Sequence, residues 1–276
     1  MAVLSTTDVR ALLAEHGLRP SRALGQNFLA DPNTATRIAR LAEVDSNDRV
    51  VEIGPGLGSL TLALAATGAS VLAIEIDRRL VPVLESVVAE APNVTVEQGD
   101  ALGLDFATLL GSGEWSCVSN LPYNVATPVV VRLLDDVPQI TRFLVMVQRE
   151  VGERLAAAPG SRASGAVSVR VAFHAEARVV GAVPASVFVP RPKVESVLVR
   201  IDRRRAPPVT VSSPARMFEL VRAGFAQRRK MLRRSLRPVL GDRVLDALAA
   251  AGIDPRARAE TLDLEAWVAL SEEAGS

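Results

Sequence analysis

The stretch Arg49–Leu62 constrains the fold of this chain more than any other. It opens with an apolar, β-branched run, Val50–Ile53, which predicts a buried strand. Glycines follow at positions 54, 56 and 58, and a helical pattern begins after them. A strand, a glycine turn and a helix together present backbone N–H groups and a helix N-terminus to a ligand. The spacing G-x-G-x-G differs from the G-x-G-x-x-G of dinucleotide-binding folds. A plain tight turn is the alternative at this point.

Composition limits the class of protein. The chain has 276 residues, of which 49% are hydrophobic and 23% charged, enough for one large domain and a small one. No apolar run is long enough to span a membrane, and the N-terminus lacks the features of a secretory signal. Cys117 is the only cysteine. His16 and His174 lie far apart, without a cysteine or carboxylate cluster, which argues against zinc. We therefore expect a cytoplasmic protein with no metal and no membrane association.

Acidic side chains follow two further predicted strands. Residues 69–74 form an apolar run that ends in Glu75, which lies 21 positions after Gly54. That separation is close to the roughly 20 expected for an acid that holds ribose hydroxyls, and a carboxylate can accept two hydrogen bonds from a diol. Residues 94–97 form another strand, and Asp100 beyond it could accept a bond from an adenine amino group. Either acid alone could be an ordinary loop acid or helix cap. Together they mark the carboxyl edge of a sheet, where ligands of open α/β folds bind.

The remaining segments complete a seven-stranded sheet and a helical region. Four more strands are expected at residues 116–119, 140–147, 167–173 and 194–201. Residues 203–208 resemble a linker. Helices are expected at 7–16 and 32–43 near the N-terminus, and at 214–224, 230–239, 242–250 and 264–271 after the linker.

The predicted fourth strand runs directly into Asn120-Leu121-Pro122-Tyr123. If the nucleotide-like ligand is S-adenosylmethionine, its methyl group is already activated, and the protein mainly has to aim a nucleophile at it. The side-chain oxygen of Asn120 and the carbonyl of Pro122 could hold the two N–H groups of an exocyclic amine. Tyr123 offers a face on which a base extruded from its stack can lie. The alternative is a strand-ending turn with a buried tyrosine.

Several blocks of residues, in order along the chain, carry a resemblance to a known family. They are residues 24–29 (LGQNFL), 51–58 (VEIGPGLG), 73–77 (AIEID), 99–101 (GDA), 120–124 (NLPYN), 188–196 (FVPRPKVES) and 225–232 (FAQRRKML). The chain resembles the bacterial small-subunit (16S) ribosomal RNA adenine N6-dimethyltransferases over about residues 20–240. The resemblance implies a Rossmann-like, seven-stranded class I methyltransferase sheet with a small all-helical C-terminal domain. It places the methyltransferase domain at residues 1–205, with a helical and loop extension at 1–45, and an RNA-contacting domain at 206–276.

The resemblance also implies roles for single residues. Contacts with the cofactor S-adenosylmethionine are implied for residues of the first loop and the strand ends: Asn27, Leu29, Gly54, Gly56, Glu75, Asp100 and Asn120. Asn120 to Tyr123 would form the catalytic turn, with Tyr123 stacked on the target adenine and Phe188 closing its other face. Ala226, Met231 and the pair Val125-Ala126 depart from the family's usual residues, and Ala226 cannot make the RNA-side hydrogen bond of the asparagine more common there.

A basic segment suggests where RNA is held. Residues 200–243 contain 13 arginines or lysines against three acids, whereas residues 1–199 contain 17 basic and 21 acidic residues. A solvated helix face is the alternative to a polyanionic partner. With the resemblance, we expect a basic helix at 227–237 whose cations contact phosphates without reading sequence. The RNA-binding candidates are Arg228, Arg229, Lys230, Arg233 and Arg234.

The expected function is transfer of methyl groups to the N6 amines of two adjacent adenosines near the 3′ end of 16S rRNA. The partner would be 16S rRNA within the small ribosomal subunit or its precursor, and the protein would be a monomer. Two alternatives stay open. One is a 23S rRNA adenine methyltransferase of the macrolide-resistance type, although the N-L-P-Y-N turn and the Q-R-R-K segment favour the small-subunit enzymes. The other is a ribosome-assembly factor that only binds RNA.

Overall fold

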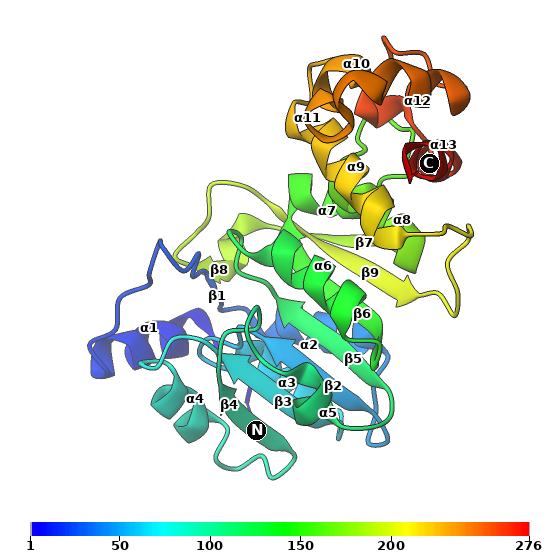
Figure 1. The fold of residues 1–276 in the computed structure, drawn as a ribbon. Coiled ribbons are helices and arrows are strands. Elements are labelled where there is room, and N and C mark those ends of the chain that lie inside the picture. The colour runs from blue at the N-terminus through cyan, green and yellow to red at the C-terminus, as the bar shows by residue number, and fades with distance from the viewer. Residues whose placement is uncertain (1, 276) are drawn as a thin grey trace. The chain divides into compact units, whose positions relative to one another are not determined.

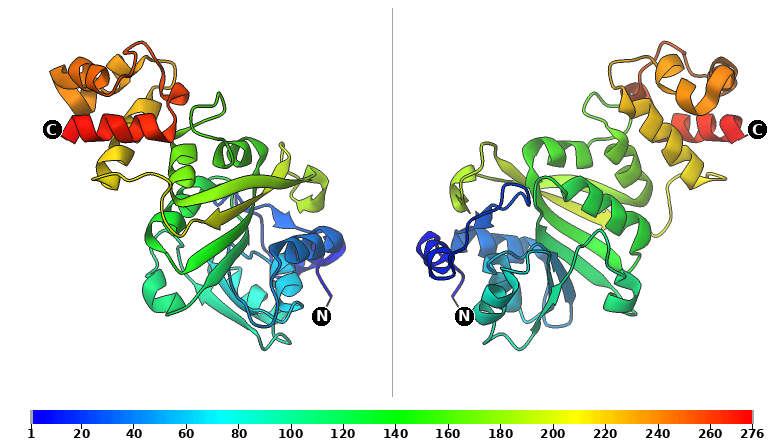
Figure 2. Two further views of the ribbon diagram at one scale, coloured as in Figure 1. Left: turned by 90° about the vertical axis from the view of Figure 1, so that its right-hand side faces the viewer. Right: turned by 60° about the vertical axis from the view of Figure 1, so that its left-hand side comes forward.

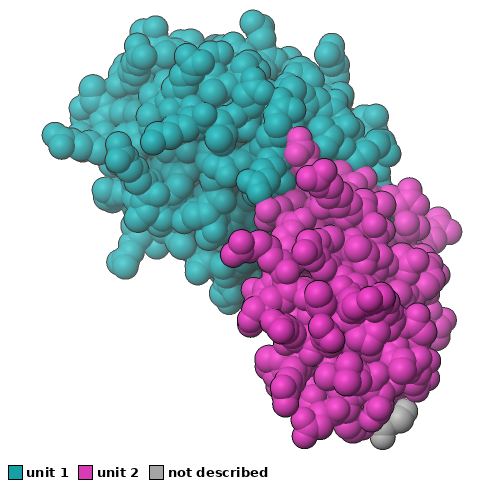
Figure 3. All heavy atoms as spheres, turned by 90° about the horizontal axis from the view of Figure 1, so that it is seen from above, with its two compact units in different colours: residues 1–152, 178–203 teal, residues 153–177, 204–276 magenta. Residues whose placement is uncertain are grey.

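The computed structural model describes residues 2–275, which divide into two compact units (Figure 3). The first unit comprises residues 1–152 and 178–203, and the second comprises residues 153–177 and 204–276. The expected domains, 1–205 and 206–276, instead assign residues 153–177 to the first. Among the described residues, no helix combines the length and the apolar character needed to cross a membrane.

The first unit is built on a seven-stranded sheet in the order β4-β3-β2-β5-β6-β9-β7 (Figure 1). Its strands are β2 (Arg49–Ile53), β3 (Ser70–Glu75), β4 (Val94–Gln98), β5 (Trp115–Asn120), β6 (Ile140–Gln148), β7 (Ala175–Val183) and β9 (Ser196–Arg203). The strands from β4 to β6 are parallel, and β9 is antiparallel to β6. The predicted α/β fold is confirmed, and the order reverses direction between β2 and β5. This reversal is the topological switch point at which open α/β sheets bind ligands.

Helices cover the sheet because both faces of its central strands are apolar, as in other parallel sheets. The helices before β7 are α1 (Thr6–Glu15), α2 (Pro32–Ala42), α3 (Ser59–Ala65), α4 (Val81–Val87), α5 (Phe106–Leu110), α6 (Ala126–Asp136), α7 (Arg149–Leu155) and α8 (Ala166–His174). One face packs on α2 and α3 in a core that includes Ile38, Leu64 and Val118. Helix α2 begins as predicted, since the Asp31 carboxylate accepts a hydrogen bond from the Thr34 N–H at 2.9 Å and Pro32 occupies its first turn.

The prediction of a strand at residues 167–173 is wrong, because this segment is helix α8 and the sheet strand β7 follows it. Alternating valines suggested a strand, but Val169 and Phe173 are four residues apart and both enter the apolar core of the second unit. Ser168 caps the helix, since its hydroxyl accepts from the Gly165 N–H at 2.9 Å. Packing on one helical face therefore overrode the β-propensity of valine.

The second unit is helical (Figure 2). Its remaining elements are α9 (Pro214–Ala226), α10 (Leu232–Ser235), α11 (Arg237–Leu240), α12 (Val244–Ala250), α13 (Leu264–Gly275) and the single turns η2 (Gly241–Arg243) and η3 (Ala259–Thr261). They enclose a core centred on the fully buried Trp267.

The single helix expected at residues 230–239 is wrong, as is the helical form expected for residues 227–230. Helix α9 ends at Ala226, and the N–H of Lys230 closes a turn on the carbonyl of Gln227 at 2.8 Å. Met231 is extended. Leu236 separates α10 from α11, and Pro238 lies in the first turn of α11, where its missing N–H leaves no hydrogen bond back to α10. The breaks let Leu232 and its apolar neighbours turn into the core.

Candidate active site

A cavity of about 160 Å³ lies in the first unit at the carboxyl ends of β2, β3 and β5. Nine of the residues singled out in the sequence line it: Asn27, Gly54, Gly56, Glu75, Asp100, Asn120, Leu121, Pro122 and Tyr123. Two of the described lining residues, Glu75 and Asp100, are acidic, and none is basic. Segments far apart in the sequence therefore meet at the switch point of the sheet, as the strand ends predicted.

The glycine turn after β2 needs glycine for two reasons. Gly54 and Gly56 have φ angles of +71° and +61°, a region that residues with a Cβ rarely adopt. A Cβ on Gly54 would lie 3.2 Å from Cδ of Pro122, and a Cβ on Gly56 would lie 2.8 Å from Cδ1 of Phe28. The turn therefore packs closely against both Pro122 and Phe28, which themselves line the cavity.

Glu75 ends β3 with its carboxylate almost out of water, at 4% exposure. Its oxygens accept hydrogen bonds from the N–H of Gly56 at 3.0 Å and from the N–H of Asp77 at 2.8 Å. Burial raises the pKa of Glu75, and these two backbone bonds oppose that rise. A carboxylate has about four acceptor positions. Those left free are available to the hydroxyls of a ligand in the cavity.

Asp100 lies beyond β4, in the turn that follows Gln98. It is exposed, and its Oδ1 accepts the N–H of Leu102 at 2.9 Å. The bond fixes the side chain beside the cavity, which Asp100 lines together with Gly99 and Leu102. The remaining acceptor capacity of this carboxylate suits an amino group.

The side chain of Asn120, at the end of β5, is oriented by the first loop. Its Nδ2 donates to the backbone carbonyl of Asn27 at 3.2 Å. Because this partner can only accept, the carboxamide must present its nitrogen there. The Asn120 oxygen is then left as an acceptor toward the cavity that Asn120 lines. One hydrogen bond therefore gives the amide the polarity needed to hold an N–H group.

The rest of the turn is fixed by three contacts. Leu121 is buried and its N–H donates to the carbonyl of Met146 at 3.1 Å. The carbonyl of Pro122 accepts the N–H of Val125 at 3.1 Å, which leaves one lone pair for a further donor. The hydroxyl of Tyr123 lies 2.8 Å from that of Ser196, a buried residue of β9, so the phenol is held at its far end.

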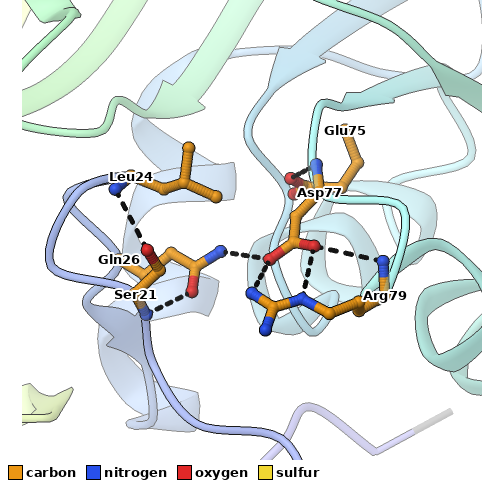
Figure 4. A network of polar contacts seen from close by, with 6 residues as sticks. All are labelled: Ser21, Leu24, Gln26, Glu75, Asp77 and Arg79. Carbon is orange, nitrogen blue, oxygen red and sulfur yellow. Dashed lines mark hydrogen bonds and ion pairs between the residues drawn. The ribbon is translucent and has the colours of Figure 1, made fainter.

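A polar network beside the cavity was not predicted from the sequence (Figure 4). Gln26 donates from Nε2 to the Asp77 carboxylate at 3.0 Å. Arg79 donates to the same carboxylate through Nε and Nη2, at 3.0 and 2.7 Å. These hydrogen bonds with Arg79 lower the pKa of Asp77 to about 2. Gln26 and Asp77 are 51 positions apart, so only their presence in two of the family-like blocks could have drawn attention to them.

Two of the residues expected to contact the cofactor or the target base do not line the cavity. A small antiparallel sheet is formed by β1 (Phe28–Leu29) and β8 (Phe188–Val189), and the single turn η1 (Ala185–Val187) directly precedes β8. Leu29 and Phe188 pair with each other in this sheet. Both side chains are buried in the core cluster that also holds Ile38. The expectation that Phe188 closes a face of the target base conflicts with this packing, because its ring is 3% exposed and surrounded by apolar side chains.

The expected RNA-binding residues belong to the second unit and differ in their surroundings. Arg228 is partly buried, and its Nη2 donates to the carbonyls of Arg162 and Ser164 at 3.1 and 3.0 Å. It therefore holds the loop before α8. The other four are exposed: Arg229, Lys230, Arg233 and Arg234.

A second buried acid, Glu52, lies in β2 at 1% exposure. Thr61 donates to its carboxylate from Oγ1 at 2.7 Å. Burial raises the pKa of Glu52 to about 8, and the nearby charge of Glu75 acts in the same direction. Glu52 therefore carries a proton at neutral pH and serves as an uncharged bridge between the strand and α3.

The fold and the polar edge of this sheet define a class I methyltransferase. Residues 18–275 match the family described as ribosomal RNA adenine dimethylase. The chain belongs to this family, and it is an S-adenosylmethionine-dependent methyltransferase of ribosomal RNA.

Three similar proteins place the chain within its family. Ribosomal RNA small subunit methyltransferase A of Thermobifida fusca is 47% identical, covering 98% of this chain and 96% of that protein. The protein of the same name from Moorella thermoacetica is 46% identical and covers 95% of this chain and 94% of its own length. The crystal structure of 23S rRNA methyltransferase ErmE has a TM-score of 0.66 and 29% identity, covering 91% of this chain and 100% of that chain.

The glycine turn gives the first prediction. Gly56→Ala should weaken S-adenosylmethionine binding by about tenfold or more, because the new Cβ pushes Phe28 and the turn apart as well as straining φ. Gly252→Ala is the matched control, since Gly252 has φ +69° with nothing within 4 Å of the new Cβ. Calorimetric titration with the cofactor checks the pair. Equal affinities in both variants would contradict a role for the close approach.

Glu52 gives a prediction about pH. Its pKa of about 8 in the folded protein exceeds the value of 4.5 for a free side chain, so the folded state binds the extra proton. The free energy of unfolding therefore falls as pH rises from about 5 to 8. Glu52→Gln removes this contribution. As pH rises from about 5 to 8, the free energy of unfolding of the variant should therefore increase relative to that of wild type by an amount on the order of a few kcal/mol. Urea unfolding at both pH values measures the difference, and a pH-independent difference would contradict the assignment.

Proposed function

We propose that this protein transfers methyl groups from S-adenosylmethionine to the N6 amines of two adjacent adenosines near the 3′ end of 16S rRNA. The observation that carries the proposal is the orientation of Asn120, whose nitrogen is tied to the Asn27 carbonyl. Its oxygen then becomes a fixed acceptor beside the cavity, as an amine nucleophile requires.

The cavity suits the cofactor. The Glu75 carboxylate, which retains free acceptor positions, would hold the ribose hydroxyls, and Asp100 would accept from the adenine amino group. Gly54 and Gly56 would let the methionine part approach the backbone, and Asn27 would close the same side. Leu29 would contribute indirectly, by packing β1 beneath the cavity.

S-adenosylmethionine supplies a methyl group that its sulfonium already activates. The chain's own residues then have to present the amine in a reactive geometry. The Asn120 oxygen and the free lone pair of the Pro122 carbonyl would each accept one N–H of the target amine. That arrangement directs the nitrogen lone pair away from the base ring and toward the methyl. Tyr123, held by Ser196, would support the base from one face.

The same geometry accommodates two transfers to one nitrogen. Each transfer breaks the S–CH3 bond and leaves a neutral thioether, and the alkylated nitrogen releases one proton to water. The monomethylated amine then keeps a single N–H, and one of the two acceptors is enough to orient it. If the base turned about this remaining hydrogen bond, the lone pair of the monomethylated nitrogen would again face the methyl group of a second S-adenosylmethionine. We therefore propose dimethylation, in agreement with the name of the family.

Small-subunit RNA is favoured over 23S RNA as the substrate. The relatives named for the small subunit are 46–47% identical to this chain, against 29% for ErmE. The partner we propose is 16S rRNA in the small subunit or its precursor, bound by a monomer in the cytoplasm. Incubation of both purified subunits with labelled cofactor, followed by mass spectrometry of their RNA, tests this choice. Label confined to 23S rRNA would contradict it.

Asn120→Ala distinguishes an enzyme from a factor that only binds RNA. Loss of the fixed acceptor should lower kcat by about 100-fold or more, with a smaller change in cofactor affinity and unchanged subunit binding. Asn47→Ala, in an exposed turn before β2, is the control and should leave kcat unaltered. Methylation at the wild-type rate by the Asn120 variant would disprove the catalytic assignment. Methylation that vanishes while subunit assembly is still supported would separate the two roles.

The exposed cations of the second unit give a prediction about RNA binding. Arg229→Gln with Lys230→Gln should weaken binding to the small subunit. The slope of log affinity against log salt should also fall, by about one for each phosphate that is no longer neutralised. Arg10→Gln with Arg40→Gln removes the same charge from exposed positions of α1 and α2 and serves as the control. Binding measured across a salt series checks the pair. Identical slopes in the two variants would refute a specific role for residues 229 and 230.

A further inference from the structure

The loop of residues 21–27 crosses from the end of β3 to the Asn120 turn and is tied down at both sides. On the β3 side, Gln26 is the connecting residue (Figure 4). Its Oε1 accepts the N–H of Ser21 at 2.7 Å, and its Nε2 donates to the Asp77 carboxylate at 3.0 Å. The Gln26 side-chain carbonyl oxygen therefore bonds within the loop, and its amide nitrogen bonds to Asp77 outside the loop. A carboxamide supplies both groups in one planar unit.

Asp77 is a firm anchor for this contact. Its side chain is 7% exposed and is gripped by the Arg79 guanidinium in a two-pronged ion pair. Arg79 also donates its own N–H to the same carboxylate at 3.1 Å. The bond from Gln26 is therefore a charge-assisted bond to a carboxylate whose geometry is already set. The N–H of Asp77 in turn donates to Glu75, the proposed ribose-binding residue.

At the other side, the same loop sets the catalytic turn. The Asn27 carbonyl receives the Asn120 amide at 3.2 Å, and the Ala23 carbonyl receives the Asn124 amide at 2.8 Å. Gly25 lies between them with φ +63°, and a Cβ there would come within 2.7 Å of Oδ1 of Asn124. The loop thus packs tightly on the turn. A displacement of residues 25–27 would carry the Asn27 carbonyl with it.

We propose that the Gln26–Asp77 hydrogen bond is a latch that positions Asn120 by fixing the loop across the donor cavity. Gln26 and Asp77 are positioning residues, since they act through Asn27 and Glu75. The inference rests on the proposed roles of Asn120 and Glu75. The latch connects the two halves of the site: Asp77 contacts the ribose-binding carboxylate through its N–H and the loop through its side chain. Cofactor affinity and the orientation of the acceptor for the target amine therefore depend on one contact.

Gln26→Glu tests the latch with almost no change of shape. The new side chain can still accept the Ser21 N–H, but it has no donor for Asp77 and places a second negative charge beside it. We expect Kd for S-adenosylmethionine to rise and kcat to fall, each by about tenfold or more. KM for small-subunit RNA and the midpoint of thermal unfolding should stay near the wild-type values. Gln139→Glu is the matched control. The side-chain amide of Gln139 also donates one hydrogen bond to a loop, at the Gly111 carbonyl, but near the amino ends of β5 and β6, away from the cavity.

Reversal of the hydrogen bond separates the contact from general damage to the loop. In the double variant Gln26→Glu with Asp77→Asn, the amide at position 77 can donate to the new carboxylate. Recovery of at least half of the missing cofactor affinity, on a logarithmic scale, supports the latch. No recovery in the double variant overturns it, and so does wild-type Kd and kcat in Gln26→Glu. If wild-type protein binds the cofactor but methylates no small-subunit RNA, the proposed function fails whatever these variants do.

Discussion

The hydrogen bonds from the backbone to the buried carboxylate of Glu75 hold the functional edge of the sheet together. A carboxylate at 4% exposure has given up most of its water, and the amides of Gly56 and Asp77 replace part of that hydration. Gly56 belongs to the turn after β2 and Asp77 follows β3, so one side chain joins the ends of two neighbouring strands. Its unused acceptor positions favour a ligand that brings hydroxyls. The same carboxylate therefore joins the two strand ends and keeps acceptor positions for the ribose that we propose there.

The proposed reaction asks for position rather than for proton transfer, and the structure is consistent with this demand. Asn120, Pro122 and Tyr123 each have a defined partner, namely the Asn27 carbonyl, the Val125 N–H and the Ser196 hydroxyl. None of these bonds joins neighbouring residues of a single strand or helix. The turn is held by one bond within itself and by two bonds to distant segments, the first loop and β9. Errors of about 1 Å in such placement are costly for a reaction that depends on alignment.

Much of the sheet and most of the cavity could be predicted from the sequence, because both depend on short-range patterns. A buried parallel strand is a continuous apolar run, and glycines, acids or asparagine directly after such runs must lie at one edge. Helix α8 was missed because its valines alternate, and the residues that bury its helical face lie far along the chain. Phe218 is one of them, with its ring centroid 5.3 Å from that of Phe173. The burial of Phe188 could not be predicted for a related reason. Its antiparallel partner Leu29 is 159 positions earlier, and no local signal reveals that pairing. Gln26 and Asp77 follow the same logic, since a hydrogen bond across 51 positions leaves no periodicity.

Charge is divided along the chain in a way that suits a cationic donor and a polyanionic substrate. S-adenosylmethionine carries a sulfonium, so a basic cavity would repel it, and the described residues lining the cavity include acids but no lysine or arginine. RNA requires the opposite, exposed cations free to replace condensed counterions. The exposed cations that we propose for this role lie within residues 229–234 of the second unit, in the chain region with 13 basic and three acidic residues. The residues proposed for the donor and those proposed for RNA therefore belong to different units of the chain.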